Sequence, residues 1–188
     1  MNIHMAVKWI WIVLCGFWLL AATAQKRTIR RQSTGSRLLQ VIIVFLGVAP
    51  LFLHPFRSGL LGENFLTGRV SIHIIGLLLT LAGATLAIWA RVVLGTNWSG
   101  LVTVKENHAL ITNGPYTWVR HPIYSGLLLA LLGTALVQGK VVYLIVISLA
   151  AVALWVKLRT EERFMYETFG EEYRYYHQNV KALIPHVL

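Results

Sequence analysis

Residues 114–126 of the chain, GPYTWVRHPIYSG, place an arginine, a histidine and two tyrosines around two prolines. Gly-Pro at the start is typical of a turn, and Pro122 suits the first turn of a helix that begins after His121. The N–H groups at such a helix start favour an anion or a carboxylate. Taken alone, the segment fits better an aromatic belt at a membrane interface, with Arg120 reaching towards water.

A second cluster consists of Lys157, Glu161 and Glu162. Lys157 and Glu161 are four residues apart, so their side chains project from the same face of a helix. For this cluster alone, an ordinary ion pair at a solvated helix end is the simpler interpretation.

The C-terminal tail carries a third cluster, in which FGEEYRYY (169–176) is followed by Leu183, Ile184 and Pro185. Residues 157–178 hold five of the seven acidic residues, and their pattern predicts a helix with aromatic residues near one side. Gly170 predicts a break in that helix. By itself this cluster is typical of an aromatic surface helix.

Long apolar runs must position these clusters. Hydrophobic residues make up 56% of the 188 residues and charged residues only 13%, against about 25% charged in soluble domains. Several runs are shorter than the roughly 20 residues that span a bilayer, but together they predict an all-α, polytopic integral membrane protein with about five transmembrane helices. The runs are Met5–Thr23, Leu38–Leu53, Ile72–Trp89, Ile123–Val137 and Val141–Val156.

The net charge of +10 reflects membrane topology and does not indicate nucleic-acid binding. Five basic residues crowd the first short loop, and the first acidic residue of the chain is Glu63. Because basic short loops stay in the cytoplasm, we expect the N-terminus outside and the C-terminal helical tail in the cytoplasm. The five basic residues are Lys26, Arg27, Arg30, Arg31 and Arg37.

The connections between the runs predict where a site forms. The short turn 138–140 predicts an antiparallel helical hairpin, whereas the loop 90–122 is long and rich in glycine and asparagine. Long loops in compact proteins are often functional. The expected topology puts this loop and the tail on the same side of the membrane, so together they can build one polar site.

Several common sites have no matching pattern in the sequence. The seven histidines form no HxxH, HExxH or HxxxH pair, and Cys15 is the single cysteine. We therefore expect no metal site. There is also no GxGxxG, P-loop or GxSxG motif.

The three clusters indicate one protein family more specifically in combination than each does alone. Gly-x-Tyr, Arg-His-Pro-x-Tyr-x-Gly, an apolar hairpin, Glu-Glu, Phe-Gly-x-x-Tyr-x-x-Tyr and Ile-Pro follow one another between about Asn97 and Pro185. This order resembles the isoprenylcysteine carboxyl methyltransferase family and the related phospholipid N-methyltransferases. The resemblance implies an S-adenosylmethionine-dependent methyltransferase, with S-adenosylhomocysteine as product, that acts on a lipid or prenylated carboxylate at the cytoplasmic membrane face. We expect one membrane domain, 1–188, with an N-terminal hairpin and basic loop in 1–60 and the cofactor-binding, catalytic portion in 90–188.

The resemblance also implies site residues. Lys157 stands where the family often has an arginine near the substrate carboxylate, which keeps the charge and loses the two-pronged fork. It implies Lys157 as substrate-binding residue, and Lys157 and His121 as catalytic residues. The implied cofactor contacts are Thr103, His108, Ala109, Leu110, Ile111, Tyr116, His121, Pro122, Ile123, Tyr124 and Glu161.

Methyl transfer suits such residues, because the protein mainly has to hold acceptor and methyl group in line. Glu161 can bind ribose hydroxyls or an amino group, and the faces of Tyr116 and Tyr124 attract a cation. A carboxylate acceptor needs no general base, whereas an amine must first lose a proton, to His121 or Glu162.

Three other functions stay open. A phospholipid N-methyltransferase would use the same cofactor. An NADPH-dependent sterol or steroid reductase would resemble the same region, but such enzymes usually have asparagine where this chain has Ile123. A membrane scaffold without activity would leave Glu161 unexplained.

Overall fold

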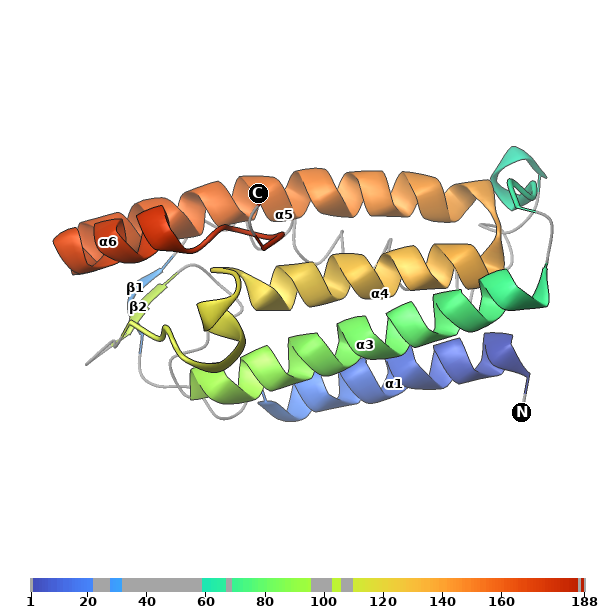
Figure 1. Cartoon of the computed structure of the whole chain (residues 1–188), viewed down its shortest axis with the longest axis horizontal. Helices are drawn as coiled ribbons and strands as arrows, with labels where there is room; N and C mark the ends of the chain where they lie inside the picture. Colours follow the sequence, from blue (N-terminus) through green and yellow to red (C-terminus); the bar gives the residue numbers. More distant parts are fainter. Residues whose placement is uncertain are drawn as a thin grey trace.

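Four long helices lie side by side in the computed structural model, in the spatial order α1, α3, α4, α5 (Figure 1). The structure describes residues 2–21, 28–31, 59–66, 69–95, 103–105, 110–185 and 187. The elements are α1 (Ile3–Ala21), β1 (Thr28–Arg31), η2 (Gly59–Gly62), α3 (Val70–Leu94), β2 (Thr103–Lys105), η4 (Gly114–Thr117), α4 (Pro122–Gln138), α5 (Val141–Phe169) and α6 (Glu171–Asn179).

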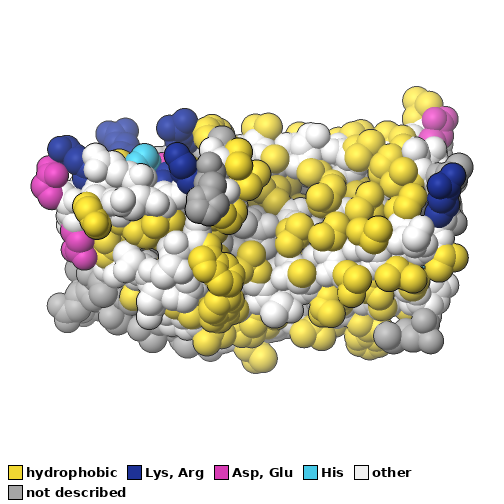
Figure 2. All heavy atoms as spheres, viewed as in Figure 1, with side chains coloured by type: hydrophobic (Ala, Val, Ile, Leu, Met, Phe, Trp, Pro, Cys, Tyr) yellow, Lys and Arg dark blue, Asp and Glu magenta, His cyan; other side chains and the backbone are white. Residues whose placement is uncertain are grey.

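Among the described residues, α1, α3 and α5 are long and apolar enough to cross a bilayer, and α4 is a shorter apolar helix. Apolar side chains cover the middle of the molecule and charged ones lie towards its ends (Figure 2). Leu19, Leu78 and Val152 are among the exposed residues of that apolar surface. The predicted helical membrane fold is confirmed in this part of the chain. The span expected at Leu38–Leu53 falls in a stretch that the structure does not describe, so the number of five spans stays a prediction.

Small residues bring α3 and α4 into close contact. A Cβ atom at Gly83 would overlap the backbone of Gly126 and Ala130, and one at Gly133 would overlap the backbone of Gly76. Membrane helices associate through such small residues, because packing replaces the hydrophobic effect there. The helices α3 and α4 therefore form a rigid pair on which the other helices pack.

The helix α1 is attached to this pair by a polar contact as well as by packing. The indole N–H of Trp11 donates to Thr134 Oγ1 at 2.9 Å, and the Thr134 hydroxyl donates to the carbonyl of Ala130 at 2.8 Å. In an apolar interior such groups need partners, so this buried contact determines how α1 is rotated against α4.

The structure contains the predicted hairpin and a helical tail with a break at Gly170, and the side of the membrane on which the tail lies stays a prediction. Gly139 ends α4 with a left-handed conformation, φ +63°, and α5 starts two residues later. The helix α5 runs on to Phe169, where Gly170 at φ +53° separates it from α6. The described helices therefore end close to where glycine predicted breaks.

Two connections between helices form a short antiparallel sheet, which the all-α prediction did not include. Strand β1, from the basic first loop, pairs antiparallel with β2, from the loop 90–122. The pairing satisfies backbone groups outside the helices. A second contact at this end is the 2.7 Å hydrogen bond from Arg91 Nη2 to the carbonyl of Ala21. Both connections thus lie at the end of the bundle where α6 lies (Figure 1).

Candidate functional site

The C-terminal tail docks on the segment that precedes α4. Val119 and Lys181 form a parallel bridge, and the N–H groups of Arg120 and His121 donate to the carbonyls of Lys181 and Ala182 at 2.8 and 3.0 Å. The Ser125 hydroxyl donates to the carbonyl of Leu183 at 2.6 Å. The tail therefore occupies the His121 N–H, at the helix start that the sequence suggested for binding an anion.

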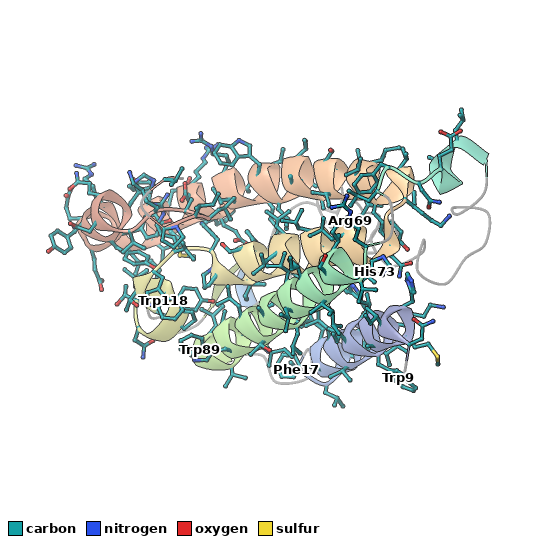
Figure 3. All side chains as sticks on the ribbon, turned by 45° about the vertical axis from the view of Figure 1, so that its right-hand side comes forward. Trp9, Phe17, Arg69, His73, Trp89 and Trp118 are labelled. Atoms are coloured by element: carbon teal, nitrogen blue, oxygen red, sulfur yellow. The ribbon has the colours of Figure 1, made fainter. Side chains whose placement is uncertain are left out.

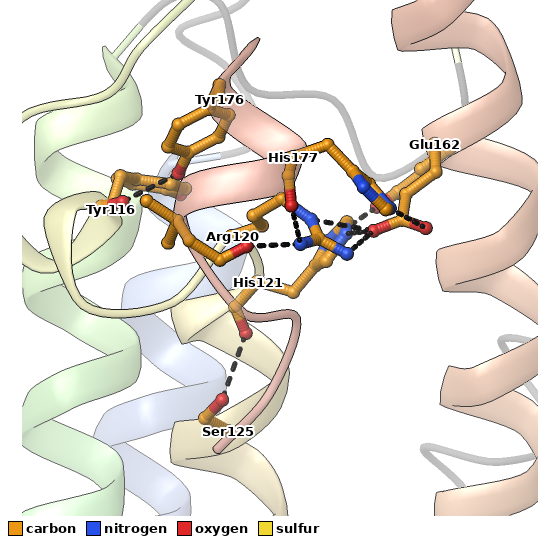
Figure 4. Close-up of polar contacts among 9 residues, drawn as sticks. Tyr116, Arg120, His121, Ser125, Glu162, Tyr176 and His177 are labelled. Carbon is orange, nitrogen blue, oxygen red and sulfur yellow. Dashed lines mark hydrogen bonds and ion pairs between the residues drawn. The ribbon is translucent and has the colours of Figure 1, made fainter. Parts of the chain in front are cut away.

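Arg120 is buried and paired, contrary to the interpretation as an arginine that reaches towards water. Its Nε and Nη2 donate to Glu162 Oε1 at 2.9 and 2.6 Å (Figure 4). Its Nη1 donates to the carbonyl of His177 at 3.1 Å and to that of Val180. The guanidinium of Arg120 thus joins the segment before α4 to Glu162 of α5 and to the end of α6.

The imidazole of His121 lies between two carboxylates. Nδ1 is 3.6 Å from Glu161 Oε2, and Nε2 is 3.4 Å from Glu162 Oε1. The ring stacks on Tyr124, with 5.4 Å between centroids and 6° between planes. Within the described residues no group of three His, Cys, Asp or Glu side chains is arranged to hold a metal ion. The arrangement instead suits proton exchange or hydrogen bonding at His121.

Lys157 and Glu161 form the ion pair that their spacing predicted. Lys157 Nζ lies 3.5 Å from Glu161 Oε1 and 5.3 Å from the ring centroid of Tyr124. Both side chains keep some exposure, 15% for Lys157 and 20% for Glu161. A partly accessible charged pair therefore lies beside His121, and the ring of Tyr124 next to it is buried.

Two buried tyrosines, Tyr116 and Tyr176, hold the backbone next to the site through hydrogen bonds. The Tyr176 hydroxyl donates to the carbonyl of Tyr116 at 2.6 Å, and the Tyr116 hydroxyl donates to that of Ala90 at 3.3 Å. Burial raises the pKa of both phenols well above the usual value, so both stay protonated as donors. On α6, burial and the nearby charge of Arg120 lower the pKa of His177, against the opposing effect of Glu162.

The structure brings together most of the described residues that the sequence singled out. His121, Tyr124, Lys157 and Glu161 contact one another.

The remaining predicted residues lie in supporting positions or cannot be placed. Tyr116 and Ile123 belong to one buried apolar cluster, Ile111 packs against it, and Leu110 beside it is half-buried. Pro122 is buried in the first turn of α4. Thr103 lies in β2, with nothing described of its side chain, and His108 and Ala109 are outside the described ranges.

Sequence reasoning missed the structural roles of Arg120, His177 and Tyr176. Glu162 had been considered only as a possible base. One feature of the sequence could have indicated this pair. Arg120 and Glu162 are expected on the same side of the membrane, and two opposite charges near an apolar interior need partners.

Comparison with known proteins agrees with the motifs. The model of the phospholipid methyltransferase family matches residues 71–172. The protein-S-isoprenylcysteine O-methyltransferase of Schizosaccharomyces pombe is 36% identical over 102 residues, 51% of this chain and 42% of that protein. The enzyme of that name from Xenopus laevis is 30% identical over 119 residues, 62% of this chain and 41% of the relative. The chain thus spans about four tenths of the length of these relatives.

A solved structure shares the fold. It is that of a eukaryotic intramembrane Ras methyltransferase, an isoprenylcysteine carboxyl methyltransferase, with a TM-score of 0.58 and 23% identity. The likeness covers 85% of this chain and 55% of that one. Together with the apolar helices, it supports a multi-pass integral membrane protein. Because the family model matches more than half of its residues, the chain belongs to the phospholipid methyltransferase family.

Proposed function

We propose that this chain is a membrane methyltransferase that uses S-adenosylmethionine to methylate a carboxylate on a lipid or prenylated, isoprenylcysteine-like molecule. The observation that carries the proposal is the partly accessible pair of Lys157 and Glu161 beside His121, at the end of the bundle where loop and tail meet. The buried ring of Tyr124 packs against this pair and against His121. Family membership supports methyl transfer as the reaction.

The residues present fit a polar, cationic cofactor. Glu161 is an accessible carboxylate, and the neighbouring Tyr124 already has a cation near its face. The imidazole of His121 is buried between Glu161 and Glu162, which holds its orientation beside that pair. When bound, the cofactor provides a methyl group on a positively charged sulfur.

The side chains then have separate roles. Glu161 would accept hydrogen bonds from the cofactor's ribose or amino group, and the ring of Tyr124 would attract its positive charge. Tyr116, Pro122, Ile123, Leu110 and Ile111 shape the apolar wall. The family resemblance implies further cofactor contacts from Thr103, His108 and Ala109. Lys157 holds the acceptor carboxylate by charge.

A carboxylate acceptor is favoured over an amine. A carboxylate is already ionised and attracted to Lys157, so it needs no general base. An amine acceptor would arrive protonated, would be repelled by Lys157, and would first have to lose a proton to His121 or Glu162. The match to methyltransferases likewise favours this reaction over NADPH-dependent reduction.

We place the site at the cytoplasmic face. The pairing of β1 with β2 puts part of the basic first loop at the same end as the candidate site. Since basic short loops stay inside, this end faces the cytoplasm, with the N-terminus outside.

Labelled methyl transfer tests the function directly. Purified protein in detergent is incubated with methyl-labelled S-adenosylmethionine and either a prenylcysteine analogue or an aminophospholipid. Label that appears on the prenylcysteine and is released by mild alkali identifies a methyl ester. Label that appears only on the phospholipid and resists alkali would identify N-methylation and contradict the proposed acceptor.

A further inference from the structure

A cavity of about 380 Å³ lies at the end of the bundle opposite the candidate site. Its polar lining comes from α1, α3, the end of α4 and the turns beside them: His4, Lys8, His73, Asn64, Gln138 and Lys140. Figure 3 shows His73 at the start of α3, next to the start of α1. A volume of this size falls within the range of about 300–1,000 Å³ that small-molecule sites occupy.

The lining is basic. It contains two lysines and two histidines, and none of the described residues that line it is acidic. The nearest glutamate along the chain, Glu63, is exposed, and its backbone carbonyl accepts from the Val141 N–H at 3.0 Å. The starts of α1, α3 and α5 also lie at this end, and helix starts carry partial positive charge. Such a cavity favours an anion.

Contacts among the lining residues hold the basic groups around the cavity. His4 Nδ1 is 3.3 Å from Gln138 Oε1, and the rings of His4 and His73 pack edge to face with 5.5 Å between centroids. Lys140 Nζ donates to the carbonyl of Gly62 at 2.7 Å. The groups therefore come from four segments that are joined before any ligand binds.

The cavity also lies beside the lipid-facing surface. Met5 lines it and is 54% exposed, and Trp9, one turn further along α1, is also 54% exposed. Such residues can lie against acyl chains while an attached phosphate enters the basic cavity. This position favours a ligand that is anchored in the membrane.

We propose that this cavity binds the phosphate of an anionic phospholipid headgroup. The site is separate from the methyl-transfer site and does not rest on the proposed activity. It would bind one lipid at the membrane face opposite the candidate active site.

The full chain, purified in detergent, is titrated with phosphatidylglycerol, phosphatidylcholine or inorganic phosphate and examined by native mass spectrometry. We expect one phosphatidylglycerol to bind about tenfold more tightly than phosphatidylcholine. Lys8→Gln combined with Lys140→Gln should remove this preference. The matched control is Arg69→Gln, because Arg69 is exposed near the same end but does not line the cavity; it should leave the preference unchanged.

Thermal unfolding in detergent first checks that the variants fold. If the double variant does not fold, Lys8→Gln alone is measured, with an expected loss of about fivefold in phosphatidylglycerol affinity. Equal binding of both lipids, or the same loss in Arg69→Gln, would overturn the proposal in favour of diffuse surface attraction. Displacement of phosphatidylglycerol by an equal concentration of inorganic phosphate would assign the cavity to free phosphate and overturn the lipid.

Discussion

The guanidinium of Arg120 donates two hydrogen bonds, of 2.9 and 2.6 Å, to one oxygen of Glu162, a residue 42 positions later in the chain. The pair joins the segment before α4 to α5. Arg120 also donates hydrogen bonds to two backbone carbonyls at the end of α6. The pair is thus the main polar connection within the site, and removing either partner leaves a buried charge.

Arg120→Ala should therefore destabilise the protein by about 3–5 kcal/mol. Glu162 would stay buried with only the more distant imidazoles of His121 and His177 beside it. The matched control is Arg163→Ala, which breaks the exposed Arg163–Glu167 pair of α5 and should cost about 0–1 kcal/mol. Unfolding midpoints in detergent measure both. Similar small losses in the two variants would show that the Arg120 pair is not a structural connection.

Gly83→Val should disrupt the α3–α4 pair, since a Cβ at residue 83 meets backbone atoms of α4 that cannot move aside. Forcing such overlap costs about 1–3 kcal/mol or more. Gly16→Val on α1 is the control, because no described atom lies within 4 Å of a Cβ there. The yield of folded protein and its unfolding temperature report the difference. Equal behaviour of both variants would argue against close helix packing.

Stability should depend on pH through His177. Its pKa is lowered in the folded state, chiefly by burial and then by Arg120, so the unfolded chain binds the proton more tightly. The stability from neutral His177 is therefore present above its unfolded pKa of about 6.5 and is lost as pH falls towards the folded value. His177→Gln should flatten the decline of the unfolding temperature below pH 6.5. An unchanged pH slope in the variant would contradict this role.

Lys157 should act on the acceptor rather than on the cofactor. Lys157→Ala is expected to leave cofactor affinity nearly unchanged and to reduce methyl transfer, because the charge that holds the acceptor carboxylate is gone. Lys157→Arg should retain activity, since the guanidinium fork suits a carboxylate. Separate measurements of cofactor binding and turnover distinguish the two effects. Equal loss of cofactor binding in Lys157→Ala and Glu161→Ala would mean that the pair only supports the helix.

The helices could be predicted from the sequence because an apolar run in lipid has few alternatives to a helix. Gly139 and Gly170 then marked where helices end. The contact between Lys157 and Glu161 also followed from local spacing, since residues four apart share a helix face. These predictions need only a short window of sequence.

Contacts between distant segments could not be predicted in this way. Nothing local to Arg120 distinguishes a buried arginine paired with Glu162 from one that reaches towards water. The docking of Lys181 and Ala182 on the segment before α4, and the ribbon of β1 and β2, likewise depend on how helices are arranged in space. The resemblance to a family indicated the group of residues, and the structure was needed for the contacts between distant segments.

The most direct test of the account is the affinity of the purified chain for S-adenosylhomocysteine, measured by calorimetry in detergent. Wild-type protein should bind it, and NADPH should not bind. Glu161→Gln should weaken binding by about 2–3 kcal/mol, the loss expected for a hydrogen bond to a charged group. Glu172→Gln, on the exposed face of α6, should bind as the wild type does. Binding of NADPH without S-adenosylhomocysteine, or full affinity in Glu161→Gln, would contradict the proposed site.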